Sequence, residues 1–113
     1  MSLKIIQWNI RHVTKNKASL STLCTNVNPH IICLQETWSH TDSNLNIPGY
    51  SVISHTPRLQ SKGGGVAILA SKYTPISPIK LPPTCNLEIC AASLFLYARQ
   101  SLLARGAYYG MAH

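Results

Sequence analysis

The sequence has very few acidic residues. Three Asp and Glu side chains stand against ten Lys and Arg in 113 residues, which gives a formal net charge of +7 with neutral histidines. Charged residues make up only 12% of the chain, so the surface has little charge repulsion to keep it soluble. With 45% hydrophobic residues, the chain is too apolar for a disordered basic tail and has the material for one folded domain.

Long apolar runs and paired metal-ligand motifs are also absent. The longest apolar runs, residues 31–34 and 66–70, are far shorter than the roughly 20 residues that cross a bilayer, so no membrane span is expected. The first residues turn polar before a signal-peptide core forms, and we expect an intracellular protein. Neither CxxC spacing nor a paired-histidine pattern surrounds the four cysteines, Cys24, Cys33, Cys85 and Cys90. Reduced core cysteines are the simpler interpretation, with a disulfide or a metal site as the alternative.

The first third of the chain has the pattern of a strand–helix–strand unit. Residues 3–9 form an apolar, β-branched run typical of a strand, and residues 31–35 form one typical of a strand buried on both faces. Between them, apolar residues at helical spacing predict an amphipathic helix over residues 17–28, with Leu20, Leu23 and Val27 facing the sheet. We expect the two strands to be parallel neighbours with a right-handed crossover.

This unit brings two polar residues to one edge of the predicted sheet. Asn9 lies at the end of the first strand and Glu36 at the end of the second. Ligand sites in α/β sheets tend to lie outside the carboxyl ends of the strands. Asn9 and Glu36 are therefore candidates for one site. The alternative is that Asn9 only turns the chain and Glu36 is solvated.

Strand patterns continue along the rest of the chain. Residues 50–55 and 66–70 predict a hairpin, and the triple glycine before its second strand opens a strand, unlike a phosphate-binding P-loop. Residues 73–83 hold four of the seven prolines and predict an irregular edge segment. Residues 87–96 predict another strand, and residues 101–113 favour a final strand over a poorly packed tail.

Four strings, in this order, resemble one family. LKIIQWNI at residues 3–10, IICLQET at 31–37, IPGY at 47–50 and GGGVAIL at 63–69 are similar to motifs of the endonuclease/exonuclease/phosphatase superfamily. The triple glycine favours the endonuclease domain that begins the reverse-transcriptase polyprotein of non-LTR retrotransposons. The resemblance implies an α+β protein, a partial four-layer α/β/β/α sandwich of the DNase I-like type, whose mixed sheet starts with a βαβ unit.

The resemblance also implies metal-dependent hydrolysis of DNA phosphodiester bonds. Glu36 corresponds to the family's carboxylate that holds Mg²⁺, and Asn9 to the asparagine beside the metal and the scissile phosphate. Mg²⁺ prefers oxygen ligands, and one carboxylate predicts weak binding of Mg²⁺ or of Mn²⁺. Tyr108, with Tyr109 as the alternative, is the candidate for the family's tyrosine. The family's later Gly-Asp-Phe-Asn and Ser-Asp-His motifs do not occur in this sequence.

Without those two motifs, the chain corresponds to about the first half of the family's domain. We assign residues 1–96 to that amino-terminal half and residues 97–113 to a divergent tail with room for one more strand. A sandwich that lacks one sheet exposes the inner apolar face of the other, so marginal stability is expected. The chain is expected to be inactive alone, because the groups that prepare the attacking water are missing.

The basic residues have two interpretations. Arg11 and Lys15 follow the first strand, Arg58 and Lys62 flank the glycine loop, and the family places both regions near its DNA-binding face. The alternative is a scattered, solvated set. The resemblance implies DNA as the partner, a reverse transcriptase in cis in the full-length element, a nuclear location for that element, no membrane and no small-molecule cofactor. A non-catalytic remnant with a basic nucleic-acid-binding surface is the alternative to an endonuclease fragment.

The other titratable residues receive no role in the reaction. Asp42, His40 and His55 lie in or near polar loops, and we expect them to be solvated. Glu88 begins a strand, where it is placed to pair with a basic residue. Among the tryptophans, Trp38 is a candidate for stacking on bases.

Overall fold

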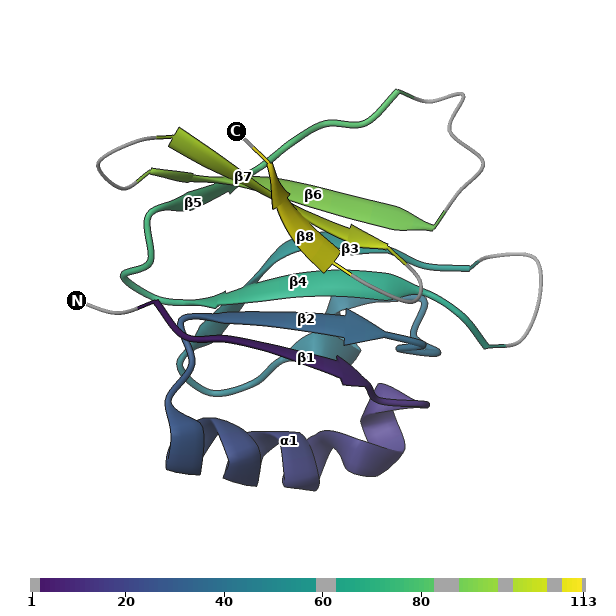
Figure 1. Cartoon of the computed structure of the whole chain (residues 1–113). Coiled ribbons are helices and arrows are strands. Elements are labelled where there is room, and N and C mark those ends of the chain that lie inside the picture. Colours follow the sequence, from purple (N-terminus) through teal and green to yellow (C-terminus); the bar gives the residue numbers. More distant parts are fainter. Residues whose placement is uncertain (1–2, 59–62, 83–87, 96–98, 106–108, 113) are drawn as a thin grey trace.

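The computed structural model describes residues 3–58, 63–82, 88–95, 99–105 and 109–112. Within these residues, one long helix covers one face of a four-stranded sheet, and a second four-stranded sheet covers the other face (Figure 1). This arrangement is the α/β/β part of the predicted α/β/β/α sandwich. None of the helices in the described ranges is long and apolar enough to cross a membrane.

The first sheet begins with the predicted βαβ unit. Strand β1 (Ile5–Asn9) pairs in parallel with β2 (Ile31–Gln35), and helix α1 (Val13–Val27) joins them. Strand β4 (Val66–Ser71) then pairs antiparallel with both β2 and β3 (Tyr50–Thr56), which gives the order β1-β2-β4-β3. The parallel pair, the hairpin and the mixed sheet are as predicted from the sequence.

Helix α1 begins earlier than the predicted residue 17. Val13 is fully buried, and its backbone N–H donates to the Thr37 carbonyl at 2.8 Å, which fixes the first turn against the segment after β2. Leu20 faces the sheet as predicted and is fully buried, whereas Leu23 and Val27 are half-buried. The helix ends at Asn28, whose left-handed backbone lets its N–H cap the Cys24 carbonyl.

The described residues also contain a second sheet, which corrects the expectation that one sheet is absent. It runs β5-β6-β7-β8 with antiparallel neighbours, from β5 (Ile76–Pro78) and β6 (Ile89–Phe95) to β7 (Arg99–Arg105) and β8 (Tyr109–Ala112). The proline-rich segment lies at the sheet edge as predicted, but three of its residues form β5. Two strands follow residue 96 where the sequence predicted one, because both continue the ladder that β6 begins.

Two apolar clusters hold the three layers together. The first lies between α1 and the first sheet, with a short 3-10 helix η1 (Asp42–Leu45) beside it, and includes Val13, Leu20, Leu34, Leu45 and Leu69. The second lies between the two sheets and consists of Ile31, Cys33, Val66, Ile68, Cys90, Ala92 and Leu94. The inner face of the first sheet is therefore covered rather than exposed.

The cysteines of the described residues behave as core side chains. Cys24, Cys33 and Cys90 are buried free thiols, as the simpler interpretation predicted, and Cys85 lies outside the described residues. Burial, with Cys90 nearby, raises the pKa of the Cys33 thiol to about 12. A thiol with so high a pKa is protonated at neutral pH and therefore chemically inert.

Candidate functional site

Asn9 and Glu36 lie at the same end of the first sheet. Asn9 is the register partner of Gln35, and Glu36 follows Gln35 directly. We call this end, made by residues 9–13, 35–39 and 63–66, the carboxyl edge. Asn9 is exposed and Glu36 is half-buried. Their convergence on one ion stays a prediction, whereas their placement at one edge follows from the parallel register.

The backbone at the carboxyl edge is held in an unusual conformation. Arg11, His12, Glu36 and Trp38 have positive φ angles of 47°, 78°, 50° and 54°. Such angles cost about 1–3 kcal/mol each in a non-glycine residue and persist where the surroundings enforce them. Here the two segments are joined directly, because the His12 N–H donates to the Glu36 carbonyl at 2.9 Å. The carbonyl of the candidate metal ligand is therefore part of a fixed turn.

Several buried polar atoms at this edge have no partner in the described part of the chain. They are the side-chain nitrogen and oxygen of Gln35, the hydroxyl of Thr37, Nδ1 of His12 and Nε1 of Trp38. Gln35 is 1% exposed and Thr37 is 0% exposed. Buried polar groups are nearly always hydrogen-bonded in folded proteins, so this cluster distinguishes the carboxyl edge as a candidate site.

A second segment supports this edge from the glycine loop. The Gly65 carbonyl accepts from the Thr37 N–H at 3.2 Å, and the Gly64 carbonyl accepts from the Trp38 N–H at 2.9 Å. The glycines are needed here because a Cβ on Gly65 would lie 2.5 Å from the Thr37 hydroxyl, and Gly65 has a φ of +90°. The glycine loop thus lies directly against the residues that follow Glu36.

Glu88 fastens the glycine loop to the second sheet. One oxygen of its carboxylate accepts from the Gly65 N–H, and the other accepts from Nε and Nη2 of Arg58 at 2.9 and 2.7 Å. Burial alone would raise the pKa of Glu88, but the hydrogen bond from Gly65 and the neighbouring Arg58 together hold it below its ordinary value. The sequence predicted a basic partner for Glu88, and Arg58 is that partner.

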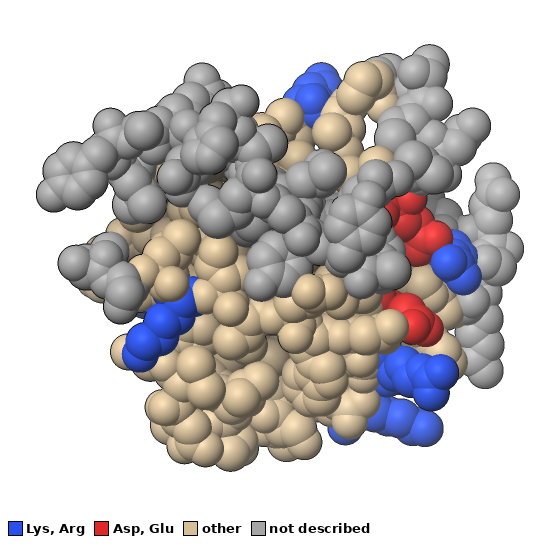
Figure 2. Space-filling model, viewed as in Figure 1, with Lys and Arg blue, Asp and Glu red and all other residues tan. Residues whose placement is uncertain are grey.

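The predicted basic residues have different surroundings. Arg11 and Lys15 are exposed near the start of α1, while the charge of Arg58 is compensated by Glu88. Lys62 and Tyr108 lie outside the described residues. Figure 2 shows acidic and basic side chains gathered on the right of the view, where β1 and β2 end in Figure 1.

The donor set at the carboxyl edge fits a hard cation. Glu36 offers a carboxylate and Asn9 an amide oxygen, the ligand types that Mg²⁺ and Mn²⁺ accept. Among the described residues, the Glu36 carboxylate has no ion-pair partner that would compete with a cation. No cluster of three or more His, Cys, Asp or Glu exists in those residues, so most ligands of a bound ion would come from water.

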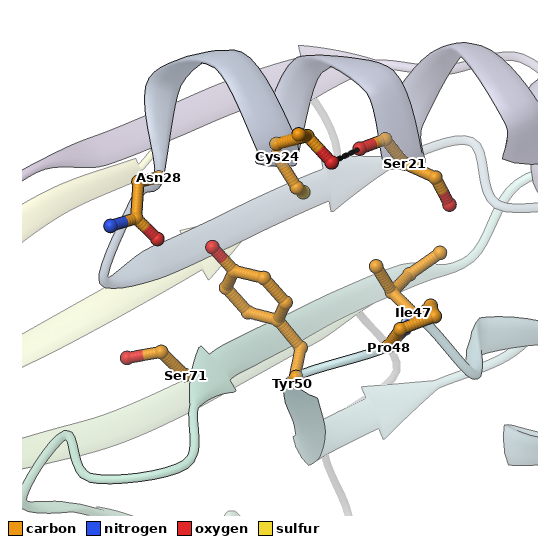
Figure 3. A pocket seen from close by; sticks show the side chains of 9 residues that line it. Ser21, Cys24, Asn28, Ile47, Pro48, Tyr50 and Ser71 are labelled. Carbon is orange, nitrogen blue, oxygen red and sulfur yellow. Dashed lines mark hydrogen bonds between the residues drawn. The ribbon is translucent and has the colours of Figure 1, made fainter.

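A pocket of about 250 Å³ lies at the opposite end of the first sheet. Figure 3 shows Tyr50 reaching from the start of β3 toward α1 inside it. The Tyr50 hydroxyl donates to the Pro29 carbonyl at 2.6 Å, and burial, with Cys24 adding to it, raises the Tyr50 pKa to about 12. Among the described residues, no Asp, Glu, His, Lys or Arg lines the pocket, so these residues give it no charged side chain.

His55 corrects the expectation of a solvated histidine. Its side chain is 4% exposed, and its Nδ1 lies 2.9 Å from the Asp42 carboxylate, which is 69% exposed. The chain turns back through η1 and places Asp42 over β3, an approach that residue spacing alone does not reveal. His40 is exposed as predicted.

Sequence reasoning missed the supporting residues of the site. Gln35 and Thr37 flank Glu36 in the QET string, which is the one local signal that pointed to them. The Arg58–Glu88–Gly65 connection has no local signal, because Glu88 lies 30 residues from Arg58 and 23 from Gly65.

Sequence comparison relates this chain to known proteins. Residues 6–105 match the family model described as Endonuclease/Exonuclease/phosphatase family. The chain is 28% identical over 81 residues to the RNA-directed DNA polymerase from mobile element jockey of Drosophila melanogaster. The alignment covers 69% of this chain and 9% of that relative, so the chain spans a small fraction of the relative's length.

Solved structures share the fold. The AP endonuclease LMAP from Leishmania major superposes with a TM-score of 0.72 and 20% identity over 91% of this chain and 39% of that one. Truncated Caenorhabditis elegans TDP2 gives a TM-score of 0.52 and 18% identity over 96% of this chain and 43% of that one. The predicted fold class and the predicted family resemblance are confirmed.

Proposed function

The chain belongs to the Endonuclease/Exonuclease/phosphatase family, and we propose that it is the amino-terminal part of a metal-dependent DNA endonuclease of a non-LTR retrotransposon. The observation that carries the proposal is the placement of Asn9 and Glu36 at the ends of adjacent parallel strands. The similarity to a mobile-element polymerase supports the retrotransposon origin. In such an element, a reverse transcriptase would follow in cis, and the nucleus would be the place of action.

Glu36 and Asn9 would hold the metal ion. Mg²⁺, or Mn²⁺ in its place, would stabilise the charge that develops on the phosphoryl group. Glu36 contributes the negative charge that attracts the ion. Asn9 has an amide oxygen for the ion and an amide N–H group that can donate to a phosphate oxygen. The fixed turn around Glu36 would keep the carboxylate from rearranging when the ion binds.

If the proposed site is correct, the affinity for the metal ion depends mainly on the Glu36 carboxylate. Free Mn²⁺ can be counted by electron paramagnetic resonance while the full chain is titrated. We expect weak binding of one ion by the wild-type chain and its loss in Glu36→Gln. Asp42→Asn is the matched control, because it removes another acid, one already bonded to His55. Equal binding by the wild-type chain and Glu36→Gln would overturn the proposed site.

The chain alone should not cut DNA. Its sequence does not contain the family's Gly-Asp-Phe-Asn and Ser-Asp-His motifs. Of the family's later catalytic residues, only the tyrosine has a proposed counterpart here, Tyr108. General acid–base catalysis alone raises a reaction rate by roughly 10²–10⁴-fold. Catalytic groups that act as a unit lose most of their effect when one of them is missing. We expect no nicking of supercoiled plasmid in Mg²⁺ or Mn²⁺ above the level of Glu36→Ala. Nicking by the wild-type chain that disappears in Glu36→Ala would prove the inactivity wrong.

The second candidate function, a nucleic-acid-binding remnant, rests on exposed cations. Arg11 belongs to the carboxyl edge and Lys15 to the first turn of α1 beside it, where both can contact phosphates without sequence preference. Binding to duplex DNA should weaken steeply as the salt concentration rises. In the Arg11→Gln, Lys15→Gln double variant, the magnitude of the slope of the logarithm of the binding constant against the logarithm of the salt concentration should decrease by about two, one for each lost phosphate contact. Lys72→Gln is the control, because this exposed lysine lies at the opposite end of the first sheet. Binding that does not change with salt would exclude such a surface.

A further inference from the structure

We propose that Glu88 is a positioning residue for the metal-binding carboxylate of Glu36. This inference rests on the proposed function, because it concerns the same metal site. Glu88 does not belong to the strings that carry the family resemblance. Its role is inferred from a continuous set of contacts that leads from the second sheet to the residue after Glu36.

The first step is the hydrogen bonding of the Glu88 carboxylate to the glycine loop. Both carboxylate oxygens are used, one by the Gly65 N–H and the other by two nitrogens of Arg58. The loop is packed closely around this contact, since a Cβ on Gly64 would lie 2.5 Å from a Glu88 oxygen. A charged acceptor forms stronger hydrogen bonds than a neutral one, so Glu88 fixes the position of the Gly65 peptide.

The second step leads from the glycine loop to Glu36. The carbonyls of Gly65 and Gly64 accept from the N–H groups of Thr37 and Trp38. These two residues directly follow Glu36, whose left-handed φ of 50° needs support from its surroundings. The other side of the turn is held by the His12 N–H on the Glu36 carbonyl. Removing Glu88 would therefore loosen one of the two supports of the turn.

The position of Glu88 excludes a direct role as a metal ligand in this arrangement. Both of its oxygens already accept hydrogen bonds, and Arg58 compensates its charge. By contrast, the Glu36 carboxylate has no ion-pair partner among the described residues. The two glutamates thus have separate tasks, one holding the backbone and one facing the cation.

The test measures Mn²⁺ binding and backbone protection in the full chain. We expect Glu88→Ala to weaken Mn²⁺ binding by roughly tenfold, the lower end of the range for residues that support metal ligands. Glu88→Gln keeps an oxygen for the Gly65 N–H and should restore part of the affinity. Asp42→Asn, which changes the contact between Asp42 and His55, should bind as the wild-type chain does.

Hydrogen exchange of the Thr37 and Trp38 amides provides a readout that needs no metal. Glu88→Ala should accelerate their exchange on the order of tenfold, with Leu34 and Leu69 in the sheet unchanged. If Glu88→Ala does not fold, the comparison is made with Glu88→Gln, which should show a smaller acceleration of the same two amides.

The outcomes separate the inference from the proposed function. Loss of Mn²⁺ binding in Glu36→Gln with full binding in Glu88→Ala would overturn the role of Glu88 and leave the metal site standing. Unchanged Mn²⁺ binding in Glu36→Gln would overturn the metal site, and with it the role of Glu88 toward a metal. Unchanged exchange of Thr37 and Trp38 in the Glu88 variants would overturn the backbone connection itself.

Discussion

The two ends of the first sheet differ in how completely their polar groups are paired. At the amino edge, made by residues 28–31, 47–50 and 71–74, the Tyr50 hydroxyl donates to Pro29 and the Ser71 N–H donates to the His30 carbonyl. None of the unpaired buried side-chain atoms found in the described residues lies there. At the carboxyl edge, Gln35, Thr37, His12 and Trp38 all carry such atoms.

The difference distinguishes the end that holds the candidate site residues Asn9 and Glu36 from the opposite end. The amino edge has a pocket without charged lining and one non-glycine residue of positive φ, Asn28. The carboxyl edge has four such residues and a carboxylate without an ion-pair partner in the described residues. Unpaired and strained groups cost stability, so they persist where another property depends on them. The pocket lies at the end whose buried polar side chains are paired, so its shape does not point to the carboxyl edge.

The largest effect should come from a methyl group added at each edge. Gly65→Ala places a Cβ against the Thr37 hydroxyl at a φ of +90°, whereas Gly49→Ala, with a φ of +85°, meets nothing within 4 Å. Strain plus overpacking should cost Gly65→Ala about 3 kcal/mol of unfolding free energy. Strain alone should cost Gly49→Ala about 1–2 kcal/mol. Urea unfolding measures both, and equal losses would show that the carboxyl edge has room to adjust.

Removing the hydroxyl of a threonine should change the free energy of unfolding by a smaller amount, with opposite signs at Thr56 and Thr37. Thr56 donates to the Ile89 carbonyl at 2.7 Å, so Thr56→Val should lose about 1 kcal/mol of unfolding free energy. The buried hydroxyl of Thr37 has no partner among the described residues, so Thr37→Val should gain up to about 1 kcal/mol. Urea unfolding of both variants tests this contrast. A loss in Thr37→Val as large as that in Thr56→Val would mean that Thr37 is paired in solution.

The smallest effect is a pH dependence that comes from Glu88. Because the folded state lowers the pKa of Glu88, its carboxylate stabilises the protein above the ordinary glutamate pKa of about 4.3, and this contribution is lost as the pH falls below that value. The ion pair is partly exposed, so the contribution should stay below about 1 kcal/mol. In urea unfolding, the wild-type chain should have a larger free energy of unfolding than Glu88→Gln at about pH 6, and this difference should decrease toward about pH 3. A difference that stays constant would contradict it.

Local pattern explains why the first sheet was predictable. The apolar runs of β1 and β2 and the helical spacing around Leu20 are properties of short segments, and the parallel pairing follows from the helix between them. That was enough to place Asn9 and Glu36 at one edge. The start of α1 was missed because Val13 is buried through a contact with Thr37, 24 residues along the chain.

The features that the sequence did not predict depend on contacts between segments that are distant along the chain. Glu88 reaches Gly65 across the two sheets, and Asp42 covers His55 from a separate short helix. The second sheet was underestimated for the same reason, since β7 and β8 become strands by continuing the ladder of β6. None of these pairings has a period or a spacing in the sequence that would have predicted it.

The most direct test of a metal site at the carboxyl edge compares the two edges in one experiment. Mn²⁺ broadens amide resonances near its binding site, and it can be titrated into the full ¹⁵N-labelled chain. We predict that the amide resonances of Ile10, Glu36 and Thr37 broaden first, that those of Asn28 and Ser71 stay sharp, and that Glu36→Gln abolishes the difference. Broadening that begins at Asn28 and Ser71, or that is equal at both edges, would contradict it.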